Sequence, residues 1–158
     1  MARQPVLIAG EWRQSVSPSG WFSAVDPASG RELEGEYPVS GFGELERALE
    51  AAQEAKVALR GTAPEGIARF LEAFADAIEE RADAIAEMAH VETGLPLEPR
   101  LRQGELLRTT DQLRQAAAAA RERSWCQATI DTKNGIRSKY GPLDGPVVIF
   151  GPNNFPLA

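Results

Sequence analysis

The last residues of the sequence place an asparagine in a turn that its neighbours restrain. Residues 150–158 read Phe-Gly-Pro-Asn-Asn-Phe-Pro-Leu-Ala, so that Asn154 lies between Pro152 and Pro156. Pro152 fixes its own φ angle, and Pro156 biases Phe155 toward an extended conformation. A side-chain amide in such a turn either donates to a developing negative charge or bonds to the backbone of its own turn. The residues alone favour the second use.

Two further residues of reactive type each occur once. Cys126 follows Trp125 and precedes a polar stretch, and we interpret it as a packed or partly exposed thiol. His90 has no second His, Cys or carboxylate at metal-ligand spacing, so we interpret it as a surface or helix-packing histidine. The sequence contains no Gly-x-Gly-x-x-Gly, Walker-type loop, zinc spacing or Ser/His/Asp set. It therefore predicts no metal site.

Helical periodicity dominates the middle of the chain. Apolar residues recur three and four positions apart between charged ones, which predicts amphipathic helices over 41–61, 62–94 and 98–122. The third range has a narrow face of small residues that suits close helix packing.

The second helical range carries its own start and stop signals. Thr62 and Glu65 fit a capping box, with Pro64 in the first turn. Asp83 is a candidate restart, and Gly94 predicts a left-handed end. We therefore expect a break within this range and a sharp stop after it.

Strand signals lie on both sides of the helices. Residues 6–37 carry short apolar runs between turn residues, including a run at 33–37, and 127–140 predict a hairpin with Asn134-Gly135 in a type I′ turn. Residues 147–150 are an apolar run without alternation, typical of a strand buried on both faces of a parallel sheet. Such a strand needs neighbours, and only eight residues follow Phe150. We expect the front part of a larger α/β protein, incomplete as a domain.

Composition narrows the class of protein. The 158 residues are 43% hydrophobic and 25% charged, as in a globular protein, and no apolar run reaches the about 18 to 20 residues that span a bilayer. A net charge of −6 argues against nucleic acid or an anionic membrane as partner. A single cysteine and the lack of a secretory signal predict a cytoplasmic location.

An ordered set of motifs resembles the aldehyde dehydrogenase superfamily. Residues 150–158 are similar to its strand-plus-turn motif, which in many members reads Gly-Pro-Trp-Asn-Phe-Pro. Ala-Gly-Glu-Trp at 9–12, Asp-Pro-Ala-Ser-Gly at 26–30 and Glu-Thr-Gly at 92–94 precede it in the family's order. Within the superfamily the sequence is most similar to α-ketoglutaric semialdehyde (2,5-dioxovalerate) dehydrogenases. Fatty-aldehyde and succinylglutamate semialdehyde dehydrogenases are the neighbouring alternatives.

The resemblance implies an α/β fold and a division of the chain. Residues 1–122 are expected to supply strands and helices of a Rossmann-like cofactor-binding domain, and 144–158 its first parallel strand and the oxyanion turn. Residues 123–143 are expected to form a β-hairpin oligomerisation arm. The implied partners are an aldehyde and, through the ribbon at 124–143, further copies of the chain in a homodimer or homotetramer.

The resemblance also implies a chemistry. The family oxidises an aldehyde with a cysteine thiolate, NAD or NADP, and a glutamate that assists thioester hydrolysis. Asn154 matches the family's oxyanion asparagine, and the subfamily analogy favours NADP. The residues expected beside the nicotinamide are Phe150, Gly151, Pro152 and Asn153. Because Asn153 stands where many members have tryptophan, a more polar substrate tunnel is expected there.

The expected nucleophile and base lie outside these residues, so the chain alone is expected to be inactive. A competing hypothesis of another class is a non-enzymatic helical module whose ribbon and bare strand pair with another chain.

Overall fold

The computed structural model describes residues 2–157 and combines helices with short antiparallel strand pairs. The helices are α1 (Phe42–Arg60), α2 (Pro64–Glu80), α3 (Ala82–Thr93) and α4 (Leu107–Glu122), with the irregular helical segments η1 (Leu97–Leu106) and η2 (Ser124–Cys126). The strands are β1 (Val6–Ile8), β2 (Glu11–Arg13), β3 (Gly20–Phe22), β4 (Val25–Asp26), β5 (Arg31–Glu32), β6 (Tyr37–Val39), β7 (Thr129–Asp131) and β8 (Ile136–Ser138).

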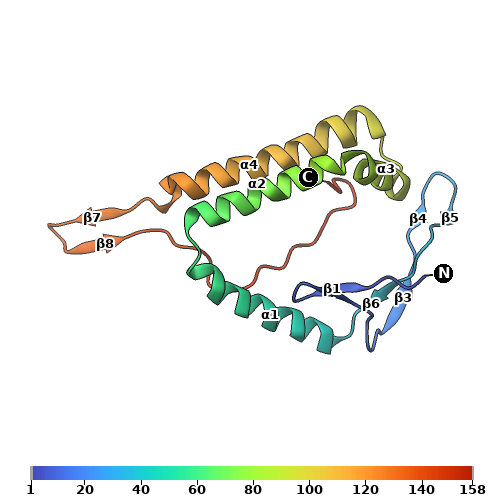
Figure 1. The fold of residues 1–158 in the computed structure, drawn as a ribbon, viewed down its shortest axis with the longest axis horizontal. Coiled ribbons are helices and arrows are strands. Elements are labelled where there is room, and N and C mark those ends of the chain that lie inside the picture. Colours follow the sequence, from blue (N-terminus) through green and yellow to red (C-terminus); the bar gives the residue numbers. More distant parts are fainter. Residues whose placement is uncertain (1, 158) are drawn as a thin grey trace.

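The helices form two separate bodies with a connecting segment between them. In Figure 1, α2 and α4 run side by side, β7 and β8 project beyond their ends, and α1 lies apart near β1. Residues 141–157 return from the hairpin past α1 and end beside α3. The C-terminal segment is thus one of the links between the two bodies, beside the direct connection from α1 to α2 and the contact of β4 with α3.

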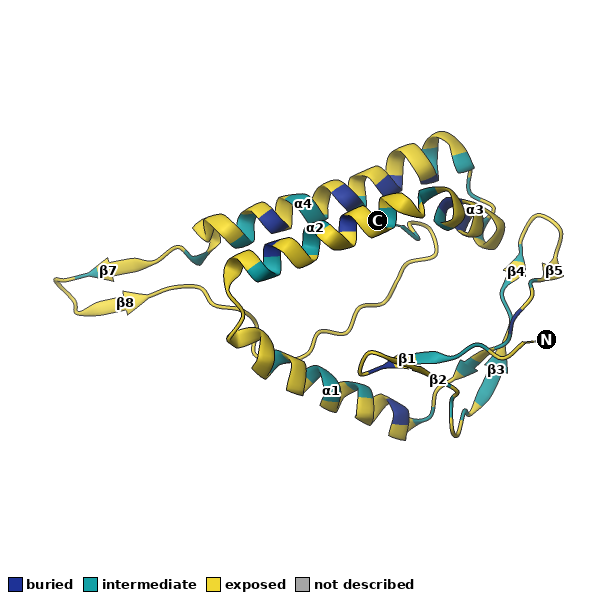
Figure 2. Cartoon of the chain, viewed as in Figure 1, coloured by how far each residue is buried: buried dark blue, intermediate teal, exposed yellow. Residues whose placement is uncertain are grey.

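Small side chains allow α2 and α4 to approach closely. Ala68 and Ala75 of α2 and Thr110 and Ala117 of α4 are all buried. Figure 2 shows buried positions spaced along both helices. The predicted small-residue face of the last helix is confirmed.

Arginines of α4 cross to carboxylates of α2 at the edge of this interface. Arg121 contacts Glu65 (2.8 Å) and Glu72 (2.5 Å). Arg114 contacts Glu79 (2.6 Å) and Asp76 in the same way. Hydrogen bonds from Arg121 lower the pKa values of Glu65 and Glu72.

The predicted helix boundaries are confirmed in part. A break occurs between Glu80 and Ala82, close to the predicted restart, and Gly94 ends α3 in the left-handed region (φ 69°). The predicted capping box is wrong: α2 begins at Pro64 after Ala63. The hydroxyl of Thr62 instead donates back to the carbonyl of Ala58 (3.3 Å), because the end of α1 lies within its reach.

The predicted helix over 98–122 is confirmed except at its start. Glu98 has extended backbone angles (φ −119°, ψ 142°), and the wider turns of η1 continue directly into the regular helix α4 at Leu107. This irregular segment carries the contacts that hold the C-terminal turn.

The hairpin at 127–140 is confirmed, but its turn differs from the predicted one. Asp131 pairs with Ile136, which leaves a loop of residues 132–135, and only Gly135 in this loop has positive φ (68°). The Asp131 carboxylate accepts hydrogen bonds from the backbone N–H groups of Lys133 (2.9 Å) and Asn134 (3.0 Å). This capping by Asp131 stabilises a longer loop in place of a two-residue turn.

The N-terminal strands form three two-stranded antiparallel sheets, β1–β2, β3–β6 and β4–β5. The run predicted at 33–37 is a strand only at its end, where Tyr37 begins β6, because Gly35 with φ of 116° turns the chain between β5 and β6. Buried Glu44 of α1 accepts hydrogen bonds from the hydroxyl of Ser15 (2.7 Å) and the N–H of Val16 (3.0 Å). These bonds, led by the one from Ser15, lower its pKa and tie the strands to α1.

The buried strand predicted at 147–150 is absent. The segment makes no strand pairing with any described residue, and Ile149 and Phe150 are 84% and 88% exposed. A strand requires a hydrogen-bonding neighbour, and the other strands between residues 2 and 157 already pair among themselves or lie elsewhere. No helix of the described residues is long and apolar enough to cross a membrane.

Candidate functional site

The C-terminal turn, residues 151–157, lies against the main apolar cluster of the chain. This cluster consists of the buried residues Ala86, Ala89, Leu101 and Leu106, and Leu157 packs against it. The N–H of Leu157 donates to Oε2 of Glu105 (3.1 Å), and its carbonyl accepts from the hydroxyl of Thr109. Both backbone groups of this residue are therefore bound to side chains of η1 and α4.

An ion pair beneath the turn extends these contacts to Asn154. Glu105 is only 2% exposed, and its Oε1 accepts a hydrogen bond from Nε of Arg100 (3.0 Å). The same guanidinium donates to the backbone carbonyl of Asn154 and lies 5.1 Å from the ring centroid of Phe155. We call Arg100, Glu105 and Thr109 the turn clasp, because together they hold both ends of the stretch from Asn154 to Leu157.

The side chain of Asn154 remains available. The residue is exposed, and its backbone carbonyl is its only bonded group among the described residues. The amide therefore does not bond to its own turn, which was the use that the residues alone favour. The geometry leaves its N–H groups free to donate to a ligand.

The four residues expected at the cofactor form one exposed stretch before Asn154. No hydrogen bond or ion pair joins them to another described residue, and a Cβ atom added to Gly151 would meet nothing within 4 Å. The structure thus places Phe150, Gly151, Pro152 and Asn153 next to the candidate donor, with free backbone groups.

A second anchor holds the upstream end of this segment on α1. Asp144 contacts Nζ of Lys56 (2.7 Å) and the guanidinium of Arg60 (2.6 Å). The hydrogen bond from Lys56, followed by the charges of Lys56 and Arg60, lowers the pKa of Asp144. Residues 145–153 therefore run between two fixed points, one on each helical body.

Sequence reasoning missed the turn clasp and the Asp144 anchor. Glu105 offered no distinct signal, because it ends the polar run Arg-Gln-Gly-Glu at 102–105 and looks like an ordinary exposed carboxylate. The partners of Asp144 lie more than 80 positions away, so no local pattern reveals them.

The other residues of reactive type make no polar contact with this turn among the described residues. Cys126 is free and partly exposed at the base of the hairpin, as predicted. His90 is exposed, and its Nδ1 donates to the carbonyl of Leu95 (2.5 Å), in agreement with a surface or helix-packing role. Among residues 2–157, no group of three or more His, Cys, Asp or Glu side chains could hold a metal ion.

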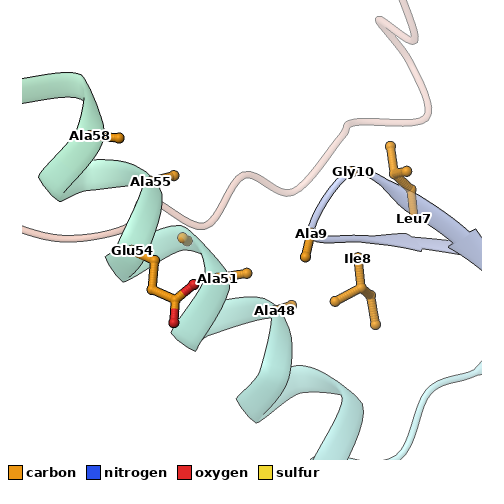
Figure 3. Close-up of a pocket in the computed structure, with 10 residues that line it drawn as sticks. Leu7, Ile8, Ala9, Gly10, Ala48, Ala51, Glu54, Ala55 and Ala58 are labelled. Carbon is orange, nitrogen blue, oxygen red and sulfur yellow. The ribbon is translucent and has the colours of Figure 1, made fainter. Parts of the chain in front are cut away.

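An open groove of about 600 Å³ lies between the β1–β2 hairpin and α1. Figure 3 shows alanines of α1, including Ala48, Ala51 and Ala55, directed toward Ile8 and Ala9 of the hairpin. Among the described residues that line the groove, Glu54 alone is charged. An apolar wall with one carboxylate lacks the convergent polar groups of a catalytic site, so the C-terminal turn remains the candidate site.

Residues 12–158 match the model of the Aldehyde dehydrogenase family, and the chain belongs to this family. It is 40% identical over 149 residues to alpha-ketoglutaric semialdehyde dehydrogenase 2 of Azospirillum brasilense, covering 89% of this chain and 28% of that protein. It is 39% identical over 123 residues to alpha-ketoglutaric semialdehyde dehydrogenase of Acinetobacter baylyi, covering 73% of this chain and 23% of that protein. These matches confirm the predicted resemblance. The chain spans about a quarter of the length of these relatives.

Solved structures agree on the fold. The NADP-dependent glyceraldehyde-3-phosphate dehydrogenase of Bacillus halodurans C-125, solved in complex with NADP, matches with a TM-score of 0.69 at 28% identity. The match covers 82% of this chain and 26% of that one. The predicted fold class, part of an aldehyde dehydrogenase-like α/β fold, is confirmed.

Proposed function

We propose that the protein containing this chain oxidises an aldehyde to a carboxylate with NAD(P), and that Asn154 donates to the oxyanion of the reaction. The observation that carries the proposal is an exposed, unbonded Asn154 amide on a turn whose backbone is fixed. Family membership supports the reaction class.

The chemistry requires a donor at this place. When a cysteine thiolate adds to the aldehyde carbon, the carbonyl oxygen acquires the negative charge. A neutral amide N–H with a fixed direction stabilises that charge as it develops, at little reorganisation cost. Loss of the hydride gives a thioester, and water then releases the carboxylate and restores the thiol. We assign neither the nucleophile nor the glutamate that assists hydrolysis to residues of this chain.

The nicotinamide cofactor, when bound, supplies the acceptor for the hydride. Phe150, Gly151, Pro152 and Asn153 fit a place beside it, because they are exposed and make no hydrogen bond to another described residue. We propose NADP rather than NAD on the subfamily analogy alone, since solved structures similar to this chain include complexes with NADP and with NAD.

The proposed substrate is a semialdehyde, with α-ketoglutaric semialdehyde first, because two relatives named for it are about 40% identical to this chain. We further propose the divisions 1–122, 123–143 and 144–158 as functional parts. The hairpin β7–β8 projects from the body, which suits an arm that pairs copies into a homodimer or homotetramer in the cytoplasm.

An activity assay of the intact protein that contains residues 1–158 tests this function. α-Ketoglutaric semialdehyde, succinylglutamate semialdehyde and a long-chain fatty aldehyde are each offered with NAD and with NADP, and reduced cofactor is followed by absorbance. We expect the highest kcat/KM with α-ketoglutaric semialdehyde and NADP. A preference for another of the three aldehydes reassigns the substrate, and no turnover with any combination refutes the proposed function.

A further inference from the structure

Glu105 is a buried carboxylate whose two oxygens are both committed to the C-terminal turn. Oε1 binds Arg100, and Oε2 binds the N–H of Leu157. Placing a carboxylate at 2% exposure is unfavourable unless its charge is paired and its oxygens are hydrogen-bonded. An apolar side chain of similar size would fill this space at lower cost. The carboxylate therefore indicates that this position must orient Arg100 and the turn as well as fill space.

Arg100 connects Glu105 to the backbone of Asn154. Its guanidinium is planar, so the bond to Glu105 Oε1 also sets the orientation in which it meets the carbonyl of Asn154 and the ring of Phe155. Its side chain is 37% exposed, whereas that of Glu105 is 3% exposed. The buried carboxylate thus fixes an arginine that would otherwise sample many rotamers in water.

We propose that Glu105, acting through Arg100, is a positioning residue that directs the Asn154 amide toward the oxyanion. This inference rests on the proposed function. Arg100 holds the backbone at Asn154, and Glu105 holds it at Leu157, so that the intervening turn has little freedom. A donor is effective only where the charge develops, and a displacement of about 1 Å can cost on the order of 100-fold in rate.

A double-mutant cycle between Glu105 and Asn154 tests this role in the intact protein that contains the chain. Glu105→Gln keeps the shape of the side chain but removes its charge. Its amide NH₂ group then faces either Arg100 Nε–H or Leu157 N–H, so one of these two donors loses its acceptor. We expect kcat to fall between about 10- and 100-fold with little change in KM, because the loss affects the transition state. In an Asn154→Ala background, Glu105→Gln is expected to have no further effect on kcat, because no amide remains to be positioned.

Two variants separate positioning from loss of folding. Arg100→Ala changes a partly exposed residue that also holds Asn154, and it should reproduce the fall in kcat per folded molecule. Circular dichroism measures the folded fraction, because this variant also leaves the buried Glu105 carboxylate unpaired. Glu87→Gln, at an exposed position of α3, is the matched control and should leave kcat unchanged. Amide hydrogen exchange at Leu157 gives a readout besides activity, and it should accelerate in Glu105→Gln and not in Glu87→Gln.

The outcomes are distinct. A fall in kcat that disappears in the Asn154→Ala background, with faster exchange at Leu157, supports the positioning role. An unchanged kcat in Glu105→Gln, or a fall that multiplies fully with that of Asn154→Ala, overturns it. If Asn154→Ala alone keeps full turnover, the oxyanion assignment fails and the positioning role fails with it. Exchange at Leu157 then still shows whether Glu105 holds the turn.

Discussion

Arginine–carboxylate pairs hold both the α2–α4 interface and the C-terminal turn, but the two sets of pairs have different surroundings. Arg114 and Arg121 bind carboxylates that are 40% to 65% exposed, at the edge of an interface already filled by alanines. Glu105 is buried under the turn. Among the described residues, the polar contacts between the turn and η1 are those of Glu105 with Leu157 and of its partner Arg100 with Asn154. Exposed pairs therefore support a structure that apolar packing defines, whereas the buried pair itself defines the position of the turn.

The largest effect is expected in the apolar cluster beneath the turn. Leu101 is fully buried there, and Leu101→Ala should lower the free energy of unfolding by about 2 to 5 kcal/mol through lost burial and a cavity. Urea unfolding followed by circular dichroism measures it. Leu107→Ala, at a position that is 56% exposed, is the control. Equal effects of the two variants would contradict the placement of this core.

Packing rather than charge should determine the stability of the α2–α4 interface. Ala75 is fully buried against α4, so Ala75→Leu should destabilise the protein by about 1 to 3 kcal/mol through overpacking. Ala73→Leu, on the exposed side of the same helix, is the control for size and helix propensity. Urea midpoints of the two variants are compared, and a tolerated Ala75→Leu would show that the helices are not closely packed.

Acid should weaken the exposed pairs of α2 and α4. Bonds from Arg121 lower the pKa values of Glu65 and Glu72 in the folded state. Their contribution is therefore fully present above the ordinary glutamate pKa of about 4.3 and is lost as the pH falls through the lowered values. Arg121→Gln should thus cause a small decrease in Tm at pH 7 and a smaller one below pH 4.

Differential scanning fluorimetry across this pH range measures the effect. The control is Arg108→Gln, on the same helix, because Arg108 forms no ion pair with another residue of the described part of the chain. A loss of Tm in Arg121→Gln that grows as the pH falls would have the wrong sign for a pair that requires ionised glutamates.

The features that the sequence could predict are those that depend on neighbouring residues in the chain. Helices α1, α2 and α3 follow from apolar periodicity, and Gly94 marks an end because a left-handed residue is needed there. These features are local, and so is the Asn154 turn with its flanking prolines. The capping of α2 was mispredicted because Thr62 had a nearer acceptor at the end of α1. In the hairpin, the side chain of Asp131 decided the loop.

The clasp could not be predicted, because it depends on the path of the chain in space. Arg100 and Glu105 are five positions apart, a spacing that meets on one face only because η1 is wider than a regular helix. Their target, the stretch from Asn154 to Leu157, is about fifty residues further along the chain. The strand predicted at 147–150 depended on neighbouring strands, and its residues carry no information about where such neighbours lie.

The most direct test of the proposed oxyanion role is the single-turnover rate of hydride transfer in the Asn154→Ala variant. It is measured with α-ketoglutaric semialdehyde in the intact protein that contains the chain. Gln53→Ala, which removes an exposed amide from α1, is the control. Loss of one oxyanion donor predicts a fall on the order of 100- to 1000-fold with an unchanged Tm. An Asn154→Ala variant that transfers hydride at the unmodified rate would contradict the role assigned to this turn.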